Sequence, residues 1–113
     1  MDEPRARELL TAERARIERQ LRELGPQPDD ELAHGEEHLA EEATDLYEDE
    51  YEAGLAERLR QELEAVGRAE ARLAAGTYGR SVESGEPIPD ERLELVPTAE
   101  RTAEEQERFE RGR

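Results

Sequence analysis

The first part of the chain repeats apolar positions with a helical period. From Pro4 to Leu24, four large apolar side chains follow one another at steps of seven, four and three residues, at Leu10, Ile17, Leu21 and Leu24. That spacing is typical of the seam of a coiled-coil helix, and a proline such as Pro4 is tolerated in the first turn. The pattern predicts a helix over residues 4–24.

A connection and a longer helix follow. Residues 25–38, GPQPDDELAHGEEH, carry two glycines, two prolines and a dense acidic run, which predict a connecting arm. Helical periodicity resumes near Leu39 and continues to Ala75, with an apolar stripe at Leu46, Leu55, Leu59, Leu63, Val66, Ala69 and Leu73. Because neither helix can bury its stripe alone, we expect an antiparallel hairpin with the arm at one tip.

The last third of the chain changes pattern. Glycines and prolines between Gly76 and Pro97 separate short extended pieces that are too brief for a sheet of their own. A short terminal helix follows, and Thr102 with Glu105 fits a Thr-x-x-Glu capping box at its start. We expect a small knuckle whose core consists of Tyr78, Ile88, Leu93, Leu95, Val96 and Phe109.

Length and composition support one small, elongated, mainly α protein. The chain has 113 residues, of which 34% are hydrophobic and only four are aromatic, so a thick core is excluded. We expect a coiled-coil hairpin over residues 1–75, with its acidic arm and tip at about 25–45. The knuckle and the C-terminal helix occupy residues 76–113.

Charge and residue usage limit the classes of function. The formal net charge of -16 argues against direct binding to nucleic acid, because such binding needs Lys and Arg to neutralise phosphates. An acidic chain is expected to bind a basic protein surface instead. No apolar run approaches a membrane span and no signal-peptide core follows Met1, which predicts a cytoplasmic protein. The absence of cysteine excludes disulfides and thiolate metal sites.

The run from Gly76 to Gln106, GTYGRSVESGEPIPDERLELVPTAERTAEEQ, resembles a known zinc-finger segment. Its Gly-Thr-Tyr-Gly start, Gly-x-Pro-Ile, Arg-Leu and Pro-Thr-Ala groups match in order the C-terminal finger of the DksA/TraR family of transcription regulators. The family's four cysteine positions fall here on Ser81, Ser84, Thr102 and Glu105. The resemblance therefore implies a degenerate, metal-free knuckle without a cofactor. We expect apolar contacts and capping by Ser81, Ser84 or Thr102 to replace the closure that zinc supplies in relatives.

The same resemblance extends to the hairpin. Counting back from the knuckle places the family's tip motif on HLAEEA, residues 38–43, with Glu41 in the acidic position and Ala43 in the alanine position. Family members insert this tip into the secondary channel of RNA polymerase, in some cases in concert with a nucleotide alarmone, and do not touch DNA. The resemblance thus implies a non-enzymatic transcription regulator that binds RNA polymerase through His38, Glu41, Ala43, Asp45 and Tyr47.

Other interpretations of the sequence remain open. The hairpin also suits an interaction module with a different protein partner. The segment from His34 to His38, HGEEH, fits the His-x-x-Glu-His pattern of inverted zinc proteases, although Gly35 and the nearby prolines favour two solvated arm residues. The carboxylates of residues 41–52 are interpreted as a solvated helix face that includes the tip, rather than as a calcium loop.

Overall fold

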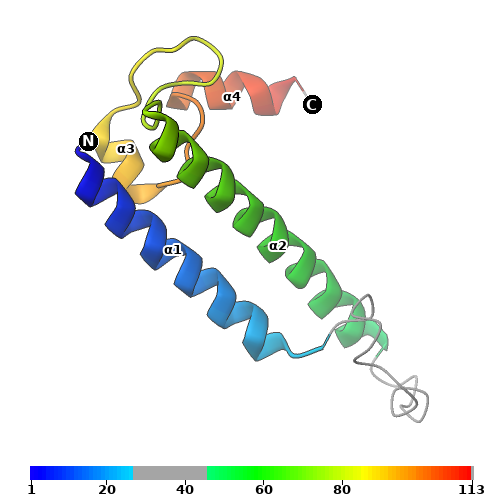
Figure 1. The fold of residues 1–113 in the computed structure, drawn as a ribbon. Helices are drawn as coiled ribbons and strands as arrows, with labels where there is room; N and C mark the ends of the chain where they lie inside the picture. The colour runs from blue at the N-terminus through cyan, green and yellow to red at the C-terminus, as the bar shows by residue number, and fades with distance from the viewer. Residues whose placement is uncertain (27–45, 113) are drawn as a thin grey trace. The chain divides into compact units, whose positions relative to one another are not determined.

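The fold was obtained as a computed structural model, which describes residues 1–26 and 46–112, without the side chains of residues 46–48. The described chain forms four helices: α1, Glu3–Leu24; α2, Leu46–Ala75; α3, Asp90–Leu95; and α4, Ala103–Arg111 (Figure 1). The protein is therefore mainly α, an antiparallel coiled-coil hairpin of α1 and α2 that continues into a small knuckle and a C-terminal helix. The predicted first helix is confirmed, whereas the predicted start of the second near Leu39 lies outside the described residues.

Two compact units make up the chain. The first combines residues 1–15 with residues 64–113, and the second consists of residues 16–63. Each unit contains a stretch of α1 and a stretch of α2. The division predicted from the sequence, a hairpin to residue 75 and a knuckle after it, remains a prediction.

The first unit contains the helix pair that leads into the knuckle. Leu10 on α1 and Val66 on α2 are almost completely buried, together with the small side chains of Ala6 and Ala69. Alanines at a helix contact allow the two backbones to approach closely. Arg14 donates from Nε and Nη2 to the carboxylate of Glu70, at 3.1 and 2.7 Å, and so joins the helices laterally.

The second unit repeats this arrangement with other residues. Ile17, Ala56 and Leu59 are buried, and Arg16 Nη2 donates to Glu62 Oε1 at 3.2 Å. The predicted stripes are confirmed at their buried positions. Their remaining described leucines are half-buried: Leu21, Leu24, Leu55, Leu63 and Leu73.

The knuckle begins where α2 stops at Gly76. This glycine has a positive φ of 82°, which favours glycine. The amide of Gly76 donates to the carbonyl of Leu73, and that of Thr77 to the carbonyl of Arg72. This pair of hydrogen bonds is the Schellman motif that ends many helices.

A small apolar cluster holds the knuckle together. It contains Ile88, Leu93 and Ala99, against which Met1 and Tyr78 pack. The Tyr78 hydroxyl donates to the carbonyl of Pro97 at 2.8 Å, and burial raises the pKa of this hydroxyl above its ordinary value. The predicted core is thus confirmed for Ile88, Leu93 and, in part, Tyr78.

The other half of the predicted knuckle core was wrong. Residues 90–95 form α3 instead of an extended piece. Residues two positions apart on a helix point about 200° apart, so Leu93 faces the cluster while Leu95 is 84% exposed. Val96 and Phe109 are 41% and 42% exposed. The missed signal is a proline followed by two acidic residues, a common helix start.

Within the described ranges, no helix has the length and apolar character that crossing a membrane requires.

Candidate functional site

The predicted tip residues lie at the edge of what the structure describes. His38, Glu41, Ala43 and Asp45 are outside the described residues, as is His34. Tyr47 belongs to α2, but its side chain is not described. These residues therefore stay a prediction, and the described geometry concerns the knuckle.

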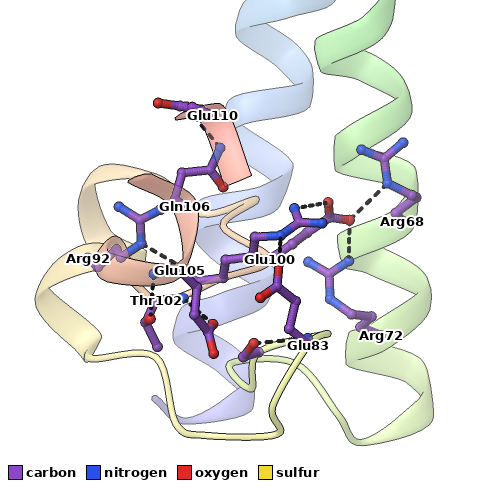
Figure 2. A network of polar contacts seen from close by, with 11 residues as sticks. Arg68, Arg72, Glu83, Arg92, Glu100, Thr102, Glu105, Gln106 and Glu110 are labelled. Carbon is purple, nitrogen blue, oxygen red and sulfur yellow. Dashed lines mark hydrogen bonds and ion pairs between the residues drawn. The ribbon is translucent and has the colours of Figure 1, made fainter. Parts of the chain in front are cut away.

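The four positions that correspond to zinc ligands in the resembled finger form a hydrogen-bonded cluster. The carboxylate of Glu105 accepts from Ser84 Oγ at 2.6 Å and from the backbone amide of Thr102 at 2.9 Å. Thr102 Oγ1 accepts in return from the Glu105 amide at 3.2 Å. These last two bonds are the predicted capping box at the start of α4 (Figure 2), which satisfies amides that the helix leaves unpaired.

Ser81 closes the first turn of the knuckle. Its Oγ accepts from the amides of Glu83 and Ser84, at 3.0 and 3.1 Å. The backbone repeats the closure, because the Ser81 amide donates to the carbonyl of Glu86 and the Gly85 amide donates to the carbonyl of Ser81. Ser84 Oγ also accepts from the amide of Glu86, at 3.2 Å. The sequence predicts capping by Ser81, Ser84 or Thr102, and this is confirmed.

The carboxylate of Glu105 is ionised at neutral pH. Glu105 is 5% exposed, yet hydrogen bonds from Ser81 and Ser84, and from the backbone amide of Thr102, lower its pKa to about 2. A negative charge in the first turn of α4 also suits the positive end of the helix dipole. The charge therefore fastens the helix to the turn around Ser84.

These side chains do not fit a zinc ion. Structural zinc sites use thiolates and imidazoles, whereas this cluster offers three neutral hydroxyls and one carboxylate that already accepts hydrogen bonds. Elsewhere in the described part of the chain, His, Cys, Asp and Glu also form no group of three that could hold a metal. Ser84 donates its hydroxyl to Glu105, but a carboxylate with a pKa of about 2 is too weak a base to activate that hydroxyl. The geometry of the cluster is that of a structural closure.

A second polar cluster connects α2 to the knuckle. Arg68 Nε and Arg72 Nη1 both donate to Glu100 Oε2, at 2.9 and 3.0 Å (Figure 2). Burial opposes ionisation of Glu100, but the hydrogen bonds and charges of the two arginines outweigh it and lower its pKa. Arg72 is the more buried arginine, and its Nε and Nη2 contact no hydrogen-bond acceptor among the described residues. Glu100 is thus the counter-ion of a largely buried cation.

A third contact joins α1 to the knuckle through α3. Arg5 donates from Nε and Nη2 to the two carboxylate oxygens of Glu94, at 2.8 and 2.5 Å. Arg5 and Glu94 are 89 positions apart in the chain. Sequence patterns relate side chains within one element, so they do not reveal such a pair.

Comparison with known proteins agrees with this geometry. The family model described as "Prokaryotic dksA/traR C4-type zinc finger" matches residues 76–111. General stress protein 16O of Bacillus subtilis is 36% identical over 98 residues, which is 86% of this chain and 57% of that protein. The RNA polymerase-binding transcription factor DksA of Caulobacter vibrioides is 38% identical over 73 residues, 65% of this chain and 51% of that protein. The chain thus spans about half the length of these curated relatives.

A solved structure extends the similarity over nearly the whole chain. The transcription factor DksA2 from Pseudomonas aeruginosa is 31% identical, with a TM-score of 0.56 and coverage of 91% of this chain and 84% of that one. The hairpin and the knuckle are both included in a match of this extent. The chain therefore belongs to the DksA/TraR family, as a member in which hydroxyls and a carboxylate stand at the zinc-ligand positions.

Proposed function

We propose that this protein is a non-enzymatic transcription regulator that binds RNA polymerase through its secondary channel, with the connection between α1 and α2 as the inserted tip. The observation that carries the proposal is its similarity to a factor named for RNA polymerase binding, at 38% identity over 73 residues. The structural similarity to a second transcription factor of the same family supports it.

Charge supports this choice of partner. The net charge of -16 disfavours contact with the DNA backbone and favours a basic protein surface, towards which an acidic probe is steered. We extend the proposal to regulation without DNA contact, and to a nucleotide alarmone that acts in concert with the polymerase. A DNA mobility-shift assay and transcription with and without the alarmone test these two points.

The residues proposed to act at the tip are those of the predicted motif. Glu41 is the acidic residue of this motif and Ala43 its alanine, while His38, Asp45 and Tyr47 flank them in the sequence. The described knuckle has a structural role, because it ends α2 and fastens α4.

The test is in vitro transcription with purified cognate polymerase and this chain. We expect Glu41→Ala and Ala43→Thr to abolish the change in transcript level caused by the wild-type chain. Circular dichroism and thermal unfolding of both variants should stay within about 0.5 kcal/mol of wild type, because the proposal assigns Glu41 and Ala43 to polymerase binding and not to the fold.

A matched control removes a carboxylate from the knuckle. Glu86→Ala deletes an exposed side chain whose oxygens make no hydrogen bond with the described residues, so it should keep full activity. Full activity in both tip variants would remove Glu41 and Ala43 from the mechanism. A wild-type chain that core polymerase does not retain in a pull-down would favour an interaction module with another partner.

A further inference from the structure

The surface of α3 and α4 carries a groove with an apolar floor. The groove has a volume of about 470 Å³, and its apolar lining comes from Val96, Ala99 and Phe109. Solvent reaches Val96 and Phe109, which are 41% and 42% exposed. Other apolar side chains are exposed elsewhere on the described surface, at Tyr51, Val82 and Leu95. Val96 and Phe109 differ in lining one groove together, and apolar groups that gather in this way often mark a binding surface.

Two charged residues of the groove are already neutralised within the knuckle. Arg101 donates to Glu83 at 2.6 Å and stacks on the Phe109 ring, 3.8 Å from its centroid. Glu100 is the counter-ion of the two arginines of α2. Because Arg101 and Glu100 have partners of opposite charge, their side chains are held in place and add little net charge to the groove.

The other two charged residues of the groove, Arg92 and Glu110, form no ion pair with the residues that the structure describes. Arg92 makes one side-chain hydrogen bond, from Nε to the carbonyl of Arg101 at 3.0 Å, which leaves both Nη atoms without a partner in the described chain. Glu110 accepts from the neutral amide of Gln106 at 2.9 Å. Figure 2 shows Arg92, Gln106 and Glu110 on one side of the polar network. A cation and an anion that form no ion pair with the described residues thus line the same groove as Val96, Ala99 and Phe109.

We propose that this groove binds the same groove of a second copy of the chain about a two-fold axis. In a two-fold contact, if residue i of one copy contacts residue j of the second copy, then residue j of the first copy contacts residue i of the second. Arg92 of each copy would pair with Glu110 of the other, and the apolar floors would face each other between the two pairs. A surface with one positive and one negative side chain on either side of apolar residues is complementary to the same surface of a second copy. A two-fold contact needs this property.

We expect the dimer to be weak and to become more stable when salt is added. Nine residues line the groove, fewer than the roughly 20–30 that each partner contributes to a stable interface. Two chains of charge -16 also repel each other. Added salt screens the long-range repulsion between exposed charges. Association should therefore be stronger at about 0.15 M than at about 0.01 M ionic strength, where the screening length is roughly 30 Å.

The test is sedimentation equilibrium of the full chain, from roughly 10 µM to 1 mM, where weak complexes associate. The average mass should rise towards twice the monomer mass with concentration. Arg92→Glu and Glu110→Arg, each alone, place like charges opposite each other twice and should weaken association at least about ten-fold. Mixing the two variants in equal amounts recreates both opposite-charge pairs and should restore association.

A control separates groove effects from net charge. Glu107→Arg makes the same charge change as Glu110→Arg on α4 but outside the groove, and should associate at least as well as wild type. If Arg92→Glu fails to fold, the comparison of Glu110→Arg with Glu107→Arg decides alone. A wild-type chain that stays monomeric at both salt concentrations overturns the proposal and leaves the groove to a segment of another protein. Unchanged association in Glu110→Arg, or a mixture of folded variants that stays monomeric, overturns it as well.

Discussion

The two leucines of α3 offer a direct test of how the knuckle is held together. Leu93 is completely buried in the apolar cluster, whereas Leu95 on the same short helix is 84% exposed. Leu93→Ala removes three buried carbons, worth about 2.4 kcal/mol at roughly 0.8 kcal/mol each, and a cavity term adds to this. Because the partly exposed Met1 and Tyr78 can move into the space, we expect a total cost of about 2.5–3.5 kcal/mol.

The matched variant Leu95→Ala should leave the free energy of unfolding within about 0.5 kcal/mol of wild type. Thermal unfolding followed by circular dichroism at 222 nm measures both variants. At roughly 4–6 °C per kcal/mol for a chain of this size, Leu93→Ala should lower Tm by about 10–20 °C. A fall of less than about 4 °C, or an equal fall for both variants, would refute the assignment of Leu93 as the central residue of the knuckle.

Three further predictions concern the polar clusters. Thr102→Ala removes half of the capping box and should cost about 1 kcal/mol in urea unfolding. Glu105 has a folded-state pKa of about 2, below its ordinary value of 4.5. Its contribution to stability is therefore present above pH 4.5 and is lost as the pH falls towards 2. Glu105→Gln should flatten the dependence of the free energy of unfolding on pH in this range. Glu100→Gln leaves the largely buried Arg72 without its counter-ion and should lower the free energy of unfolding by about 1–3 kcal/mol. The control Glu91→Gln, at an exposed position, should change it very little. Equal losses in both variants would contradict the role of Glu100 as the counter-ion of Arg72.

The closure of the knuckle was anticipated in part. Capping by Ser81, Ser84 and Thr102 follows from their places in the resembled finger and from the Thr-x-x-Glu spacing, and the structure confirms it. The sequence did not predict that the Glu105 carboxylate of this capping box also accepts a hydrogen bond from Ser84. Ser84 and Glu105 are 21 positions apart, and only the folded turn brings them together.

The sequence alone determined the elements whose signals are local. Helical period set α1 and the described part of α2, and a capping box set α4, because their side-chain spacing depends only on the geometry of one helix. The tertiary structure decided which way side chains face and which residues from distant parts of the chain come into contact. It turned Leu93 inward and Leu95 outward on α3, where the glycine and proline pattern had predicted short extended pieces.

Contacts between elements also required the tertiary structure. Arg5 meets Glu94, and Arg72 meets Glu100, across separations that no periodicity encodes. The chain has sixteen arginines and a large excess of carboxylates, so composition permits very many ion pairs of similar strength. Packing of the apolar residues selects among them, because it fixes which helix faces meet and therefore which charges come within bonding distance.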